Sequence, residues 1–197
     1  MIDRPGFVRG GLFVVYRYIM KNMSYTFFRT VFSVIFYQKG FGFMVHWKAL
    51  WINLLIPLAV GGVSAFLTKD SMETYAQVTQ PPLSPPGWLF PIVWTILFLL
   101  MGLAAYLVWI RDSTGRNGAL LFYGLQLAMN FGWTLVFFNL QNYGLALLWL
   151  IVLWILILIT VVRFFKESKA AGWLMIPYLL WVTFAGSLNA GVWLLNR

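Results

Sequence analysis

The chain has 197 residues, of which 61% are hydrophobic and 10% charged, and it carries a formal net charge of +9. This composition excludes a water-soluble globular protein, because too few polar side chains are present to cover a surface in water. The lack of cysteine excludes disulfide bonds, a thiolate nucleophile and a sulfur-ligated metal site. We expect an integral membrane protein.

The first 46 residues differ from the rest. They contain six Lys or Arg residues and one acid, and their apolar runs, 11–16 and 31–37, are too short to cross a bilayer. Three interpretations are open: a basic helix lying on anionic lipid, an imperfect targeting segment, or a translated leader upstream of the true start. We favour the leader, because Met44 would open a compact start to the first span; the nucleotide sequence would decide between Met1 and Met44.

Five later runs are long enough to span a membrane, since crossing about 30 Å of hydrocarbon as a helix takes roughly 20 apolar residues. Short polar segments separate them, so consecutive helices should be antiparallel neighbours. The predicted fold class is an all-α integral membrane protein, a bundle of five transmembrane helices. The expected spans are about 47–67, 88–110, 118–138, 143–165 and 171–195.

Lys and Arg in the short loops indicate the orientation. The loop after the second span carries Arg111 and Arg116, and the loop after the fourth carries Lys166 and Lys169. The first loop has only Lys69, and the third has no basic residue. We therefore expect the N-terminus to lie inside. The expected location is a bacterial cell membrane.

A proline-rich loop, Pro81-Pro82-Leu83-Ser84-Pro85-Pro86, connects the first two spans. Proline fixes φ and favours an extended backbone, so this loop should be a semi-rigid cover and not a helix. It leads into a span that carries Trp94 and Phe98. A rigid cover beside an aromatic wall suggests a ligand site.

Three spans combine aromatic, small and amide residues on one helix face. In the fifth span a four-residue spacing forms a slowly drifting stripe of Pro177, Trp181, Ala185, Asn189 and Trp193. Spacings of three and four give similar faces, with Trp94, Phe98, Met101, Gly102, Ala105 and Trp109 in the second span, and Gln126, Asn130, Trp133 and Phe137 in the third. Amides in hydrocarbon need partners, so Gln126, Asn130 and Asn189 should point inward, to one another or to a bound molecule.

Packing competes with ligand binding as an explanation of these faces. Tryptophan at a span end usually belongs to the interfacial aromatic belt, and small residues within spans are usually helix contact points. Trp94, Trp133 and Trp181 lie too deep for the belt, which leaves packing or a ligand wall. His46, the only histidine, precedes the first span at headgroup level, and we expect no metal site.

Three further motifs follow the proline loop in order. They read Met101-Gly102-Leu103-Ala104-Ala105-Tyr106-Leu107-Val108-Trp109, Gln126-Leu127-Ala128-Met129-Asn130-Phe131-Gly132-Trp133, and Pro177-Tyr178-Leu179-Leu180-Trp181. Together these motifs resemble the TspO/MBR family, which includes the tryptophan-rich sensory proteins and the mitochondrial translocator protein, or peripheral benzodiazepine receptor. The resemblance covers residues 47–197 and all five spans.

The resemblance implies a five-helix bundle, often dimeric, with a pocket beneath the loop between the first two helices. Family members bind porphyrins and haem-pathway intermediates, benzodiazepine-type drugs and, in animals, cholesterol. By motif position, together with Gln126 from its helix face, the ligand-binding residues would be Tyr75, Trp94, Phe98, Gln126, Asn130, Trp133, Trp181 and Ala185. We assign no catalytic residue. Trp94 and Trp181 would donate electrons if this protein, like some bacterial members, degrades porphyrin in light.

We therefore expect a membrane receptor or sensor for porphyrin or another tetrapyrrole-pathway ligand. We expect no required cofactor, and porphyrin or haem would be the ligand. The expected partners are the lipid bilayer and a second copy of the chain, and we expect no binding to nucleic acid. The alternatives are a light-dependent porphyrin-degrading enzyme and a transporter of small apolar solutes. The spans lack buried ionisable residues, which disfavours the transporter.

The loop departs from the family pattern. That pattern commonly reads Lys-Pro-Ser-Trp-x-Pro-Pro, whereas this chain has Gln80 followed by Pro81-Pro82-Leu83-Ser84-Pro85-Pro86. Lys69 is then the loop cation that could meet a porphyrin propionate. Ala190 and Gly191 stand where the animal cholesterol motif needs a tyrosine, so we predict no sterol binding.

Overall fold

The computed structural model describes residues 45–71, 77–82 and 84–197. Expectations about Tyr75 and about residues 1–44 lie outside these ranges. Within them the chain forms helices and no strand. The helices are α2 (Trp47–Thr68), α4 (Leu89–Trp109), α5 (Arg116–Thr134), the π-helix η1 (Leu135–Asn139) that continues α5, α6 (Tyr143–Glu167) and α7 (Lys169–Leu195).

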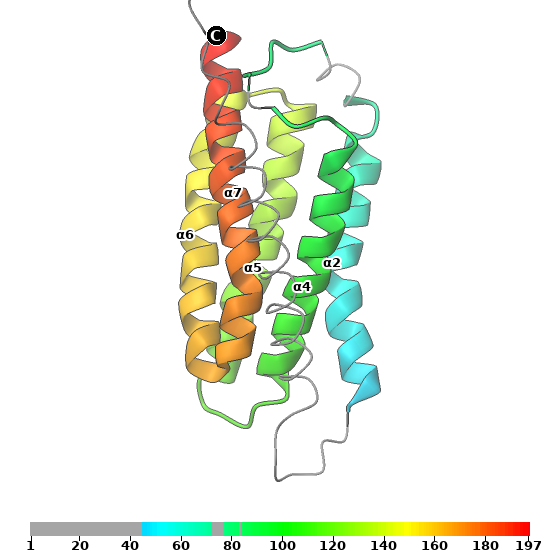
Figure 1. Ribbon diagram of the computed structural model, residues 1–197, viewed down its shortest axis with the longest axis vertical. Helices are drawn as coiled ribbons and strands as arrows, with labels where there is room; N and C mark the ends of the chain where they lie inside the picture. The colour runs from blue at the N-terminus through cyan, green and yellow to red at the C-terminus, as the bar shows by residue number, and fades with distance from the viewer. Residues whose placement is uncertain (1–44, 72–76, 83) are drawn as a thin grey trace, which may run out of the picture. The chain divides into compact units, whose positions relative to one another are not determined.

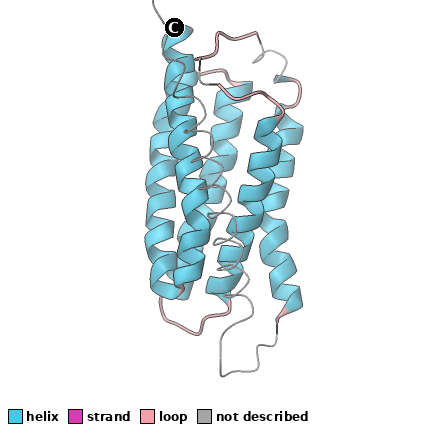
Figure 2. Cartoon of the chain, in the orientation of Figure 1, coloured by secondary structure: helices cyan, strands magenta, loops and turns pink. Residues whose placement is uncertain are grey.

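Five segments in this described part are long and apolar enough to cross a membrane, counting α5 and η1 as one. Figure 1 shows them side by side, with consecutive helices running in opposite directions. Figure 2 shows that the connecting loops lie at the two ends of the bundle. The predicted fold class, an all-α bundle of five transmembrane helices, is confirmed.

Polar residues set the ends of the last two helices. Asn142 is the N-cap of α6, where its side chain accepts a hydrogen bond of 3.0 Å from the backbone N–H of Leu145. Ser168 ends α6 and caps α7, accepting from the N–H of Ala171 at 3.4 Å. Gln141 has a φ of 52°, in the left-handed region that permits the sharp reversal between η1 and α6. Short polar connections therefore bring consecutive helices together.

Replacing Ser168 by alanine should lower the free energy of unfolding by about 0.5–1 kcal/mol, because α7 loses its N-cap. Thermal unfolding in detergent, followed by circular dichroism, measures the change. Ser187→Ala is the matched control, since this exposed hydroxyl bonds only to the carbonyl of Phe184 in its own helix. Equal losses in the two variants would contradict the capping argument.

Helix α2 is the least buried of the five helices. It packs mainly against α4, which in turn packs against α7, while α6 packs against both α5 and α7. The buried residues of α2 form a narrow stripe of Ala49, Pro57, Ser64 and Thr68. Large apolar side chains such as Trp51, Ile52 and Leu55 are exposed and are free to face lipid. One side of α2 therefore fixes it to the bundle.

Glycine allows α2 and α4 to approach closely. A Cβ atom on Gly102 of α4 would lie 2.6 Å from the carbonyl oxygen of Asn53 and 2.8 Å from the Cα of Leu54. Gly61 of α2 in turn leaves room for the ring of Phe98, which would overlap a Cβ placed there. Small residues at such crossings let helix backbones pack closely within a membrane. This contact positions the aromatic residues of α4.

Candidate functional site

Helices α4 and α7 bring six aromatic residues together. Ring centroids lie 5.5 Å apart for Trp94 and Phe98 and 6.1 Å apart for Trp94 and Tyr178. The ring centroid of Trp181 lies 6.0 Å from that of Phe90 and 5.7 Å from that of Phe184 on the same helix. These separations are typical of interacting aromatic pairs. We call this group the α4–α7 aromatic cluster; its members are Phe90, Trp94, Phe98, Tyr178, Trp181 and Phe184.

Helical spacing explains why these rings meet. The three members on α4 are four residues apart and the three on α7 are three apart, so each set lies on one helix face. The two helices pack against each other, which places the faces in contact. Trp94 and Trp181 are only half-buried, whereas Tyr178 is fully buried. The cluster therefore has a buried floor and partly accessible tryptophan rings.

Two buried polar atoms of predicted site residues have no hydrogen-bond partner within the described part of the chain. They are Nε1 of Trp181 and Oε1 of Gln126. Gln126 is fully buried in α5, and its Nε2 lies 3.9 Å from the sulfur of Met101. A buried polar atom without a partner costs about 1–3 kcal/mol. A bound molecule could satisfy such atoms.

A second set of contacts joins α5, α6 and α7. Nε1 of Trp133 donates to Oδ1 of Asn189 at 3.3 Å, and Nδ2 of Asn189 donates to the carbonyl of Tyr143 at 2.8 Å. Trp133 also stacks on Phe137, with centroids 5.2 Å apart and an interplanar angle of 29°. We call these four residues the Asn189 junction. Its hydrogen bonds link α5 and α7 to the beginning of α6.

Hydrogen bonds fix the loop between α2 and α4 to two helix ends. The side chain of Asn196 accepts from the N–H of Thr79 at 3.1 Å and donates to its carbonyl at 2.9 Å. On the other side, Asn139 donates to the carbonyl of Leu67 at 3.0 Å and accepts from the hydroxyl of Ser71 at 2.8 Å. The described parts of the loop are thus attached both to the end of α7 and to the end of η1.

The proline segment and the loop cation also have defined neighbours. Pro81 packs so closely on α7 that a Cβ on Gly191 would lie 2.9 Å from its Cγ. Lys69 places its Nζ 5.1 Å from the ring centroid of Phe66, within cation–π distance. The loop therefore extends across one end of the bundle, as Figure 1 shows for the coloured part of the trace.

The structure brings several predicted site residues together. Trp94, Phe98 and Trp181 all belong to the α4–α7 aromatic cluster, in which Trp94 contacts Tyr178 of α7 and Trp181 contacts Phe90 of α4. Asn130 of α5 joins them indirectly, because its Nδ2 donates to the hydroxyl of Tyr178 at 3.1 Å. Three helices thus contribute to one site.

Other predicted residues are placed differently. Trp133 belongs to the Asn189 junction, where its N–H already has a partner. Ala185 is half-buried, one turn beyond Trp181 on α7, and Gln126 is buried against Met101. Tyr75 lies outside the described residues. A ligand-binding role stays a prediction for all the predicted site residues.

Sequence reasoning missed Phe90, Tyr178 and Phe184. Each lies in a strongly apolar segment, where a further aromatic residue does not stand out. The available signal was their spacing, since each is three or four residues from Trp94 or Trp181 on the same helix.

The bundle, the aromatic cluster and the attached loop define a polytopic α-helical membrane protein with a cluster of aromatic residues between two of its spans. The sequence profile of the TspO/MBR family matches residues 53–194. The chain belongs to the TspO/MBR family, and the resemblance found in its motifs is confirmed.

Known relatives cover most of the described domain. The tryptophan-rich protein TspO of Archaeoglobus fulgidus is 38% identical over 145 residues, which are 73% of this chain and 94% of that protein. The tryptophan-rich sensory protein of Cereibacter sphaeroides is 38% identical over 148 residues, 75% of this chain and 92% of its own length. The translocator protein of Bos taurus is 32% identical over 147 residues, 73% of this chain and 87% of its own. Bacterial, archaeal and animal proteins thus share this domain.

Proposed function

We propose that this protein is a membrane receptor or sensor that binds a porphyrin, or another flat tetrapyrrole-pathway ligand, at the α4–α7 aromatic cluster. The observation that carries the proposal is the buried, unpaired N–H of Trp181 within a cluster formed by two helices. The name of the Cereibacter sphaeroides relative, a sensory protein, supports the receptor role.

Stacking and burial would supply most of the affinity. A flat ring between aromatic faces gains about 25 cal/mol for each Å² of apolar surface removed from water. Aromatic pairs add about 0.5–1.5 kcal/mol each beyond that area term. The half-buried rings of Trp94 and Trp181 offer such faces while Tyr178 forms the floor.

The N–H of Trp181 would fix the orientation of the ligand. A porphyrin carries carboxylates and ring nitrogens, either of which can accept a hydrogen bond. Supplying an acceptor removes the penalty of about 1–3 kcal/mol for a buried unpaired donor. The hydrogen bond therefore favours binding of a ligand that has an acceptor at that position over binding of a purely apolar ligand.

The test is a titration of the detergent-purified full chain with protoporphyrin IX, followed by the shift of its Soret absorption band. Saturable binding is expected in the wild type. Trp94→Leu/Trp181→Leu should weaken it about tenfold or more, because two stacking rings are lost. The matched control is Trp47→Leu/Trp173→Leu, since these tryptophans are 63% and 62% exposed and lie outside the cluster.

A single substitution separates hydrogen bonding from stacking. Trp181→Phe keeps an aromatic ring and removes the N–H, so affinity should fall several-fold, by about 1 kcal/mol. Far-UV circular dichroism checks that each variant is folded. Binding that never saturates, or that is equally strong in the cluster variant Trp94→Leu/Trp181→Leu and in the control variant, would overturn the proposal. Unchanged binding by Trp181→Phe would remove its main support.

A further inference from the structure

A groove of about 390 Å³ lies between the beginning of α5 and the end of α6. It is at the end of the bundle away from the loop that carries Pro81, and so is separate from the α4–α7 aromatic cluster (Figure 1). The volume falls within the range of about 300–1,000 Å³ found for small-molecule sites. We call it the α5–α6 groove.

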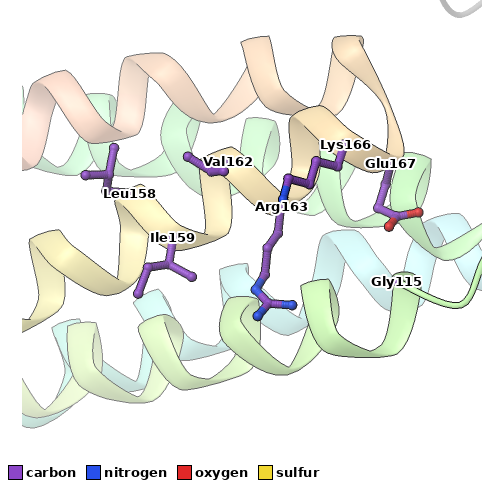
Figure 3. Close-up of a pocket in the computed structure, with 7 residues that line it drawn as sticks. All are labelled: Gly115, Leu158, Ile159, Val162, Arg163, Lys166 and Glu167. Atoms are coloured by element: carbon purple, nitrogen blue, oxygen red, sulfur yellow. The ribbon is translucent and has the colours of Figure 1, made fainter.

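The α5–α6 groove is apolar along most of its length and charged at one end. Leu158, Ile159 and Val162 of α6 form the apolar wall. One turn further on, Arg163 and Lys166 supply two positive charges. These residues share one face of α6, because they are spaced at three and four positions. Figure 3 shows this succession from the hydrocarbon wall to the charged end.

Arg163 is held in place by α5. Its Cζ lies 4.4 Å from the ring centroid of Phe122, a cation–π contact. A Cβ on Gly118 would lie 3.0 Å from a guanidinium nitrogen, so glycine at that position leaves room for the charged group. Figure 3 shows the side chain of Arg163 extending from α6 toward α5. A guanidinium fixed in this way loses little further freedom when it binds an anion.

The acidic residue of the groove points to the adjoining loop. Glu167 accepts a hydrogen bond from the hydroxyl of Ser113, and its carboxylate lies beside Gly115. Residues 111–116 and 163–167 together contain four Lys or Arg and two acidic residues. The charged end of the groove is therefore set in a positive environment, which attracts anionic headgroups.

We propose that the α5–α6 groove binds an anionic phospholipid, with its phosphate between Arg163 and Lys166 and an acyl chain along the apolar wall. Guanidinium groups bind phosphate through two parallel hydrogen bonds, and the ammonium adds a second charge. The apolar wall identifies the ligand as a lipid, because free phosphate would leave Leu158, Ile159 and Val162 without a partner. The lipid would contact α5 and α6 together.

The test is native mass spectrometry of the full chain released from nanodiscs of phosphatidylcholine with increasing phosphatidylglycerol. The wild type should retain one phosphatidylglycerol in preference to phosphatidylcholine. Arg163→Gln/Lys166→Gln should weaken this retention about 10- to 30-fold, since each basic residue near the surface contributes about 1 kcal/mol. Lys48→Gln/Lys169→Gln removes the same charge from the same end of the bundle, outside the groove, and should retain the lipid.

Three outcomes would overturn the proposal. Equal loss in the groove and control variants would indicate general surface attraction. Equal retention of phosphatidylcholine and phosphatidylglycerol would exclude a charge-specific site. Displacement of the lipid by excess inorganic phosphate would identify a phosphate site in place of a lipid site. Thermal unfolding in detergent verifies that each variant is folded, and Arg163→Lys, which keeps the charge, should restore part of the retention.

Discussion

Replacing Gly102 by valine should lower the free energy of unfolding by about 3 kcal/mol, because the new side chain meets backbone atoms. The first added carbon would already lie 2.6 Å from the carbonyl oxygen of Asn53. A flexible side chain could turn aside, but the backbone of α2 can move only if the helix shifts as a whole. The displacement would also affect Phe98, whose ring lies against Gly61 of α2.

Unfolding in detergent with increasing sodium dodecyl sulfate, followed by circular dichroism, measures this loss. Gly62→Val is the matched control, because a Cβ on Gly62 meets no atom within 4 Å. That substitution should change stability by less than about 1 kcal/mol, the range expected for replacing glycine in an exposed helix interior. Similar losses at Gly62 and Gly102 would contradict the close-approach argument.

Replacing Asn189 by leucine should lower the free energy of unfolding by about 1–3 kcal/mol, because two interhelical hydrogen bonds are lost, each worth about 0.6–1.7 kcal/mol. The N–H of Trp133 would lose its acceptor, and the carbonyl of Tyr143 would lose a donor. The side chain of Trp133 is buried in the bundle, where no bulk water replaces the missing partner.

A double-mutant cycle tests this link directly. Trp133→Phe removes the N–H that Asn189 accepts while keeping an aromatic ring beside Phe137. The two substitutions should be less than additive by about 0.5–1.5 kcal/mol, since they remove the same bond. Strict additivity would show that the bond contributes nothing to stability.

The number and type of helices could be predicted from the sequence, because the bilayer imposes a length on each apolar segment. The polar residues at which the spans end could be predicted equally well. Asn142 and Ser168 lie in short polar segments and act as helix caps. The π-helix at Leu135–Asn139 was not predicted, since one extra residue in a helical turn leaves no clear trace in an apolar sequence.

The stripe predicted on the fifth span divides between two neighbours. A residue four positions on advances by about 40° around an α-helix, so a four-residue repeat turns steadily away from its first contact. Trp181 accordingly faces Phe90 of α4, Asn189 bonds to residues of α5 and α6, and Trp193 lies against Gly144 of α6. The residues of this stripe therefore do not all face one site.

Tertiary contacts between distant residues could not be predicted from spacing. Asn130 was expected to need a partner, yet nothing in the sequence indicated Tyr178, which lies 48 positions away. The attachment of Thr79 to Asn196 spans 117 positions and depends on where the loop crosses the bundle. Such pairs are set by helix packing, which a single sequence does not specify.

The bonds between Asn196 and Thr79 matter for labelling and purification. Asn196 is followed by Arg197, so a tag or fluorophore joined there begins one residue from the side chain that holds the loop. A bulky group at that place can pull the asparagine away from Thr79 and release the loop. Reporters of ligand binding are therefore better attached at the beginning of α2, at the opposite end of the bundle, where they avoid both this attachment and the residues of the α5–α6 groove.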